Sequence, residues 1–328
     1  MIKNIKIYFF SIIFGLLIPN TTWGVSSLGC LGATVAEYLI PGLGYGVLGQ
    51  FDKMLILGGA RWMAINKYMA YVSDSDFEQN YENIYKKTNL EDEKNQHDFF
   101  YSKETFYANA YLSIYGDLTF VTFYDLYDKG CEYNPDTYGL MLSPFKIWEY
   151  GDEFTFWVPT IWASSVPLDS DLITYHVDSD LSRKEMINTS FLQYQLVGVG
   201  EEMLFRGVIQ QSLFKLLTVG GVSKSFSRWG SIITASAVFG AAHAGRGFSA
   251  TPGIAFAAGL YLGWVYHPVD GDFDLTQPIA IHSWWDTILE HRRLSGAKYV
   301  ERKDGENAQN YTLVSHRTYP LLGFNYTF

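Results

Sequence analysis

The sequence predicts an all-α fold, a polytopic helical bundle integrated in a membrane. Apolar residues make up 48% of the 328 residues and aromatic residues 17%. This aromatic load is typical of proteins that contact the interfaces of a bilayer. Long apolar stretches with helical spacing of their polar residues fill the last third of the chain. The mean hydropathy is near zero, at −0.01, so the composition indicates spanning helices diluted by sizeable aqueous loops.

Charge and cysteine content exclude several classes of protein. The net charge is −10 and no cluster of Lys and Arg occurs, which argues against a nucleic-acid partner. The two cysteines, Cys30 and Cys131, allow at most one disulfide. They therefore exclude a disulfide-rich scaffold and a four-cysteine zinc site.

Residues 1–24 have the pattern of a targeting segment. Lys3 and Lys6 precede a short apolar run, Ile7–Ile18, which ends at Pro19. About 12 apolar residues are too few for an ordinary span of roughly 20, so this segment is predicted to be a signal peptide, with a retained N-terminal anchor as the alternative.

Residues 25–168 are predicted to form a membrane-associated region. Glycines and Pro41 interrupt the apolar stretch 28–70, which favours a close-packed membrane hairpin, with a soluble glycine-rich hairpin as the alternative. The polar stretch 73–105 is predicted to be an aqueous loop. The aromatic stretch 106–127 is expected to be helical, and 154–166 to be a short span or an interfacial segment.

A polar connector, 169–184, precedes the region that carries the chemistry. Residues 186–293 are predicted to be one domain, followed by a polar tail at 294–328. Four helical stretches are expected in this domain, at about 186–217, 229–244, 251–266 and 277–291.

The most informative motif places Glu201, Glu202 and Arg206 within an apolar helix. Ionisable residues at membrane depth are costly, so they are candidates for function. Glu202 and Arg206 are spaced i, i+4 and can pair on one face. Glu201 lies about 100° around the helix and can face the bundle interior as a general base. The alternative is a purely structural ion pair.

Two further motifs place histidines on apolar helices. His243 ends the segment that begins with Phe239, and taken alone it is more typical of a core histidine than of a catalyst. His282 and Asp286 are spaced i, i+4, so the carboxylate can orient the imidazole.

Together these motifs predict a hydrolytic site. A water activated by Glu201 with help from His243 would attack a carbonyl group, and His282 would stabilise the oxyanion. No cofactor is expected. A zinc ion held by Glu201, His243 and His282 is the alternative.

The three motifs in this order resemble the signature of the CPBP family, the CAAX-protease and bacteriocin-processing enzymes also called Abi. The resemblance covers about 110 residues. It implies a multi-pass intramembrane endopeptidase in which Glu201, His243, His282 and Asp286 are catalytic. Glu202, Arg206 and Phe239 would then be supporting residues.

The resemblance also sets expectations for partners and location. The last position of the third motif is often Asn in the family, and Asp286 stands there, so we expect it to orient His282. The substrate is expected to be a membrane-associated peptide or protein, and the location a bacterial inner or plasma membrane. The alternatives are an inactive scaffold or immunity protein on the same fold and a metal-dependent membrane protease.

Overall fold

The computed structural model describes residues 27–74, 81–86, 95–168, 170–243, 252–268, 273–301, 316–318 and 325–327. The predicted targeting segment at residues 1–24 lies outside them. Most described residues are helical, which confirms the helical class. The helices before residue 168 are α2 (Ser27–Leu39), α3 (Leu43–Val47), α4 (Phe51–Lys53), the π-helix η1 (Met54–Gly58), α5 (Gly59–Val72), α6 (Lys103–Asp128), α7 (Asp136–Met141), the 3₁₀ turns η2 (Ser143–Phe145) and η3 (Ile147–Glu149), and α8 (Phe154–Ser165).

The 3₁₀ turn η4 (Ser170–Leu172) lies in the predicted connector. The helices after it coincide with the four helical stretches predicted from the sequence, and they are α9 (Arg183–Glu202), the π-helix η5 (Met203–Gln210), α10 (Gln211–Val219), α11 (Lys224–Ala242), α12 (Pro252–Tyr266) and α13 (Thr276–Gly296). The first stretch is one continuous run through α9, η5 and α10. Its start is fixed by a capping box in which Ser182 and Glu185 satisfy each other's backbone amides.

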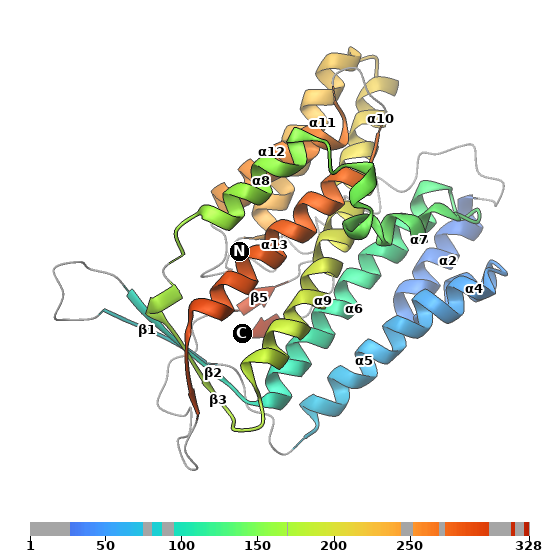
Figure 1. Cartoon of the computed structure of the whole chain (residues 1–328). Coiled ribbons are helices and arrows are strands. Elements are labelled where there is room, and N and C mark those ends of the chain that lie inside the picture. Colours follow the sequence, from blue (N-terminus) through green and yellow to red (C-terminus); the bar gives the residue numbers. More distant parts are fainter. Residues whose placement is uncertain are drawn as a thin grey trace, which may run out of the picture.

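Three long helices form the centre of the bundle. α9 packs between α6 and α13, and α5 covers α6 on its other side (Figure 1). α11 and α12 pair with each other and reach the same core through η5. Among the described residues, no helix combines the length and the apolar character needed to cross a bilayer.

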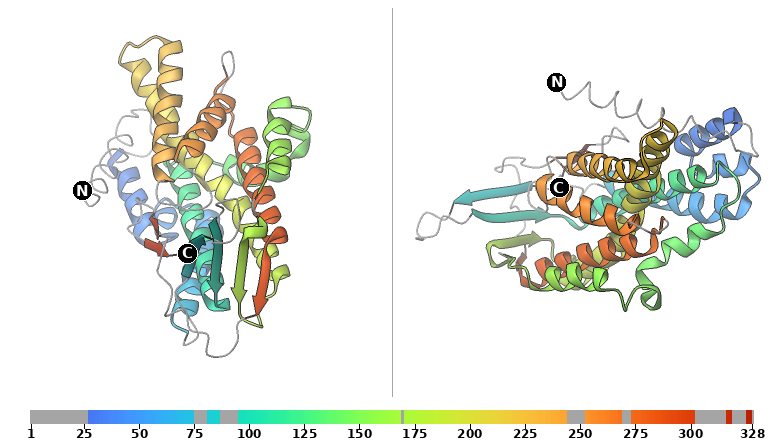
Figure 2. Two further views of the ribbon diagram at one scale, coloured as in Figure 1. Left: turned by 90° about the vertical axis from the view of Figure 1, so that its left-hand side faces the viewer. Right: turned by 90° about the horizontal axis from the view of Figure 1, so that it is seen from above.

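A four-stranded sheet lies at one end of the bundle (Figures 1 and 2). Its strands are β1 (Tyr81–Lys86), β2 (Asn95–Tyr101), β3 (Ile173–Val177) and β4 (Lys298–Glu301) in that order, with β1 antiparallel to β2 and the other pairs parallel. A separate pair, β5 (His316–Thr318) and β6 (Asn325–Thr327), is antiparallel.

The sheet was not predicted from the sequence. Its strands come from the segments expected to be an aqueous loop, a polar connector and a tail. β2 leads into α6, β3 leads into α9, and β4 follows α13, so pairing the strands fixes one end of the three central helices. The core beneath it contains the ring of Phe99, which stacks on the rings of Tyr101 and Tyr175.

The short helices α2 to α5, which we call the N-terminal module (residues 27–72), are joined to α6 by buried polar contacts. Lys53 pairs with Asp125 of α6 at 2.6 Å, and inside the module Arg61 pairs with Glu37 at 2.7 Å. The predicted hairpin is therefore a compact group of helices, with the turn at Gly42 closed by amides that donate to Glu37.

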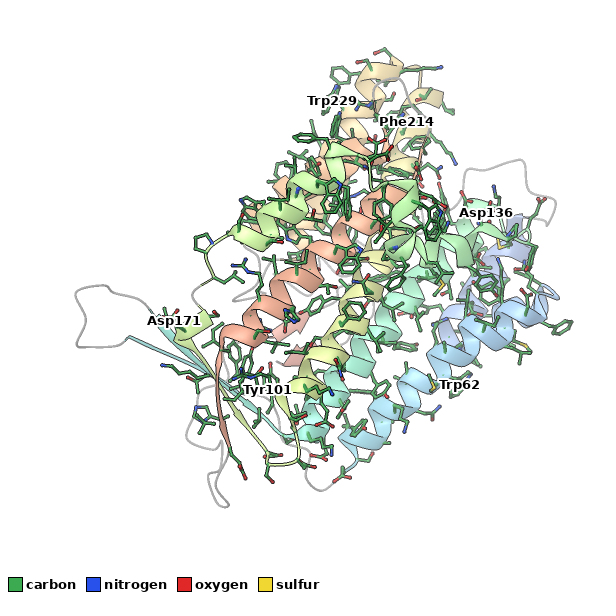
Figure 3. The ribbon with its side chains drawn as sticks, viewed as in Figure 1. Trp62, Tyr101, Asp136, Asp171, Phe214 and Trp229 are labelled. Atoms are coloured by element: carbon green, nitrogen blue, oxygen red, sulfur yellow. A yellow bond between two sulfur atoms is a disulfide. The ribbon has the colours of Figure 1, made fainter. Side chains whose placement is uncertain are left out.

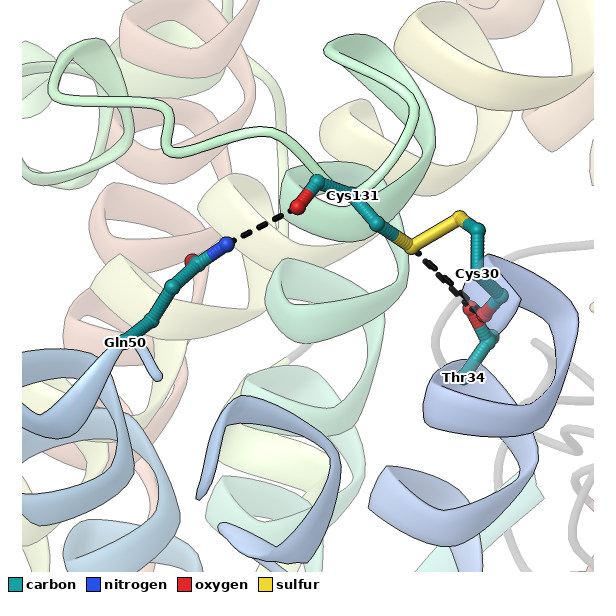
Figure 4. Close-up of a disulfide and its surroundings, with 4 residues drawn as sticks. All are labelled: Cys30, Thr34, Gln50 and Cys131. Carbon is teal, nitrogen blue, oxygen red and sulfur yellow. Dashed lines mark hydrogen bonds between the residues drawn. A yellow bond between two sulfur atoms is a disulfide. The ribbon is translucent and has the colours of Figure 1, made fainter. Parts of the chain in front are cut away.

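A disulfide fastens the same module covalently. Cys30 at the start of α2 is bonded to Cys131, just after α6 (Figure 4). The Nε2 of Gln50 donates to the backbone oxygen of Cys131 at 2.9 Å. The sequence allowed one disulfide at most, and the structure contains that disulfide.

Candidate active site

The candidate site is built around the point where α9 becomes the π-helix η5. Glu201 and Glu202 are the last residues of α9, and Arg206 lies within η5. Short π segments occur often at functional sites because the wider turn redirects side chains within an otherwise regular helix. All three side chains are buried, with Glu202 and Arg206 fully enclosed.

Two glycines bring the neighbouring helices unusually close to this turn. A β-carbon at Gly198 would lie 2.7 Å from the Cα of Ser283 in α13, and one at Gly200 would lie 2.6 Å from the backbone oxygen of Asp117 in α6. Only a residue without a β-carbon permits this spacing, so the glutamates are fixed relative to both neighbours.

Arg206, Glu202 and His282 form a hydrogen-bonded chain. The Nε of Arg206 donates to Oε2 of Glu202 at 2.9 Å, and Nδ1 of His282 lies 2.8 Å from Oε1 of the same carboxylate. The i, i+4 pair expected from the sequence is present. Because a carboxylate accepts, Nδ1 must carry the proton, and Nε2 points to the opposite side of the imidazole.

Glu201 lies on that opposite side, between the two histidines. Its Oε2 is 3.8 Å from Nε2 of His243 and 3.9 Å from Nε2 of His282. These separations exceed the length of a direct hydrogen bond, and polar atoms so placed can be bridged by a water molecule. The geometry therefore suits a water bound between a carboxylate and an imidazole.

His243 is oriented by its own helix. Its Nδ1 lies 2.8 Å from the backbone oxygen of Phe239, which fixes the tautomer and leaves Nε2 directed at Glu201. The ring of Phe239 packs against His243, with centroids 4.4 Å apart, and meets His282 edge-on at 5.8 Å. Arg206 stacks on it, with its guanidinium carbon 5.1 Å from the centroid. The ring of Phe239 therefore contacts His243, His282 and Arg206 and lies among them.

The structure places Asp286 beside His282, as its i, i+4 spacing predicted. His282 also has a partner that was not predicted, because Glu202 contacts its Nδ1. Asp286 is 3.4 Å from the other ring nitrogen, Nε2. Its side chain is 27% exposed, against 7% for His282. Asp286 therefore lies at the edge of the site, beside the nitrogen that would meet an oxyanion.

The alternative of a zinc ion held by Glu201, His243 and His282 stays a prediction. In the part of the chain that the structure describes, no group of three or more His, Cys, Asp or Glu side chains is placed to hold a metal ion. Glu201, His243 and His282 are nevertheless gathered at the site, with Oε2 of Glu201 3.8 Å and 3.9 Å from the two Nε2 atoms.

Residues 185–288 match the family described as Type II CAAX prenyl endopeptidase Rce1-like. The Rce1-like proteins are part of the CPBP family, so this match confirms the resemblance over residues 185–288. The match begins in α9 and ends in α13, so it contains every predicted site residue and about a third of the chain. CPBP proteins are membrane-embedded proteases that act on peptide or protein substrates. Neither the curated proteins nor the solved structures gave a significant match.

The sequence did not predict the residues that join α9 to α13 next to the motif residues. Besides Gly198 and Ser283, these include Gln195, whose Nε2 donates to Oγ1 of Thr287 at 2.8 Å. Ser283 in turn donates to the backbone oxygen of Gln195 at 3.0 Å. Ser283 and Thr287 are spaced i, i+4 on the helix of His282, which places them on one face. The sequence alone does not show that this face contacts Gln195 of α9.

The position of Asp286 leads to a prediction about its replacement. Asp286→Asn should retain peptidase activity within about 10-fold of the parent, because the amide keeps the contact with His282 and can also donate to an oxyanion. Asp286→Leu removes the polar group and should lose about 10²-fold, the usual effect of a lost oxyanion partner. Initial rates with one fluorogenic peptide would measure both. An equal loss in both variants would mean that the negative charge itself is required.

Proposed function

We propose that the protein is a membrane-associated endopeptidase of the CPBP type that hydrolyses a peptide bond with a water activated by Glu201. The observation that supports this proposal is the placement of Oε2 of Glu201 between the Nε2 atoms of His243 and His282. A scaffold gains no stability from holding such a group of titratable side chains in a buried site.

The proposed reaction assigns one task to each group. Glu201 takes a proton from the bound water, and the resulting hydroxide attacks the carbonyl carbon of the scissile bond. His243 helps to hold the water, since its tautomer is set by Phe239. The proton taken by Glu201 passes to the leaving amine as the carbon–nitrogen bond breaks.

His282 is proposed to stabilise the oxyanion. Its Nδ1 proton is engaged by Glu202, so a second proton on Nε2 would be directed toward the reacting carbonyl oxygen. Glu202 is in turn held by Arg206 and acts on the reaction only through His282. We assign Glu202 and Arg206 as positioning residues, and Glu201, His243 and His282 as catalytic residues.

The substrate class follows from the family rather than from a pocket. The matching description names CAAX prenyl endopeptidases, and we propose a C-terminal or membrane-proximal segment of a membrane-associated protein as substrate.

A comparison of the parent with Glu201→Gln tests the proposal. Both proteins would be reconstituted in lipid vesicles and assayed with a fluorogenic peptide library, with and without a chelator. We expect cleavage by the parent, a loss of about 10²- to 10⁴-fold in the variant, and no effect of the chelator, because glutamine cannot act as a general base.

Each other outcome supports a different mechanism. Loss of parent activity with the chelator would favour a metal-dependent protease. Full activity in Glu201→Gln would overturn the assignment of the base. A parent that cleaves no member of a library that includes prenylated CAAX peptides would favour the scaffold or immunity alternative.

A further inference from the structure

The N-terminal module has its charges inside and its apolar side chains outside. Residues 27–72 contain only five charged side chains, and three of these, Glu37, Lys53 and Arg61, are buried in ion pairs. Lys53 and Arg61 have no exposed surface at all. A helix in water normally arranges such residues the other way round.

The outer face of the module is almost entirely apolar. We define this face by its exposed large apolar side chains, which are Leu28, Val35, Leu39, Ile40, Leu43, Val47, Phe51, Leu55, Ile56, Trp62, Met63 and Met69. Figure 3 shows Trp62 on the side of α5 that is turned away from α6. An exposed apolar surface of this extent marks an interaction site rather than ordinary surface variation.

The two remaining charges, Asp52 and Lys67, flank the part of the outer face that runs from Leu55 to Met63. Both are exposed, and the fifteen residue steps from one to the other rise by about 22 Å at 1.5 Å per residue. Between these two positions, every exposed large side chain is apolar except Asn66. The hydrocarbon core of a bilayer is about 30 Å thick, so a band of this height can lie within it.

Lipid fits this face better than a second protein does. Protein interfaces carry a polar rim and about one hydrogen bond per 100–200 Å², and this band offers almost no donor or acceptor for such bonds. A medium that cannot solvate charge also explains why Lys53 and Arg61 turn inward, since each would be costly in contact with hydrocarbon.

We propose that the outer face of the N-terminal module contacts the acyl chains of a lipid bilayer, with Asp52 and Lys67 near the two polar boundaries. The module lies outside the segment that matches the protease family, so this surface is separate from the site of hydrolysis. The long stem of Lys67 allows its ammonium group to reach the headgroups from within the band.

Site-directed fluorescence in vesicles tests this proposal. The two native cysteines are joined to each other, so a single introduced cysteine can be labelled selectively. Full-length Leu55→Cys and Met63→Cys would carry a bimane probe in phosphatidylcholine vesicles. Asp180→Cys is the matched control, because Asp180 is an exposed polar residue near the sheet, paired with Lys103 at 3.0 Å.

We expect doxyl-labelled lipid to quench the probes at positions 55 and 63 at least three-fold more strongly than the probe at 180, and aqueous iodide to show the reverse order. Equal iodide quenching at all three positions would overturn the proposal, because the face would then be in water. Protection from both quenchers at 55 and 63 would also overturn it, because protein would then cover the face. No outcome depends on turnover, so the result is independent of whether the protein cleaves a peptide.

Discussion

Replacing Glu202 with alanine is expected to lower both the stability of the protein and its peptidase activity, each for a separate reason. Among the described residues, Glu202 is the only hydrogen-bond acceptor of the fully buried Arg206, and removal of one partner from a buried pair costs about 3–5 kcal/mol of unfolding free energy. The same change releases Nδ1 of His282, and misplacement of a catalytic group by about 1 Å can cost 10²-fold in rate.

A double variant separates the two effects. Glu202→Ala combined with Arg206→Met removes both charges, so most of the lost stability should return while the activity stays low. Glu202→Gln is the milder control, because its amide oxygen can still accept from one of the two partners. Thermal unfolding in detergent and initial rates in vesicles give the two readouts. Recovery of activity in the double variant would show that His282 does not depend on Glu202.

Gly198→Ala is expected to separate the glutamates from the histidine across from them. The added methyl group would collide with the backbone of Ser283, and backbone cannot move aside as a flexible side chain can. Overpacking of this kind costs about 1–3 kcal/mol. Because Ser283 is adjacent to His282, any retreat of α13 also widens the gap to Glu201, and we expect about a 10²-fold loss of activity.

Gly59 provides the matched control for this steric argument. It is also a helical glycine, at the start of α5, but a β-carbon there meets nothing within 4 Å. Gly59→Ala should therefore leave activity unchanged and raise stability by about 0.5–1 kcal/mol. Equal activity in Gly198→Ala and the parent would mean that the close approach of α9 and α13 is not needed for catalysis.

The helices and the candidate site residues could be predicted from the sequence because both depend on local patterns. The spacing of apolar residues located α9 to α13 within a few residues. A charged side chain in an apolar helix is energetically costly, so its presence indicates a functional candidate. The pairing of Glu202 with Arg206 followed from helical geometry alone. These inferences needed no knowledge of which helices are neighbours.

The features that escaped prediction depend on contacts between distant segments. The strands β2, β3 and β4 are separated by whole helices, and each has only four to seven residues, too few to be recognised as a strand from the sequence alone. The contact of Glu202 with Nδ1 of His282 escaped prediction for the same reason, because it joins two helices, whereas the i, i+4 neighbour Asp286 lies on the helix of His282. The π-helix after Glu202 likewise has no local signature.

The bond between Cys30 and Cys131 has a consequence for how the module is retained. It joins residues 101 positions apart, so the closed loop contains α3 to α6 and all of α2 after its first three residues. In the chain-entropy view, closing a loop of about 100 residues stabilises the folded protein by roughly 4–5 kcal/mol, through the unfolded chain rather than through any contact. The stabilisation that the disulfide gives to the lipid-facing helices would therefore arise only in oxidising surroundings, outside the compartment where thiols are kept reduced.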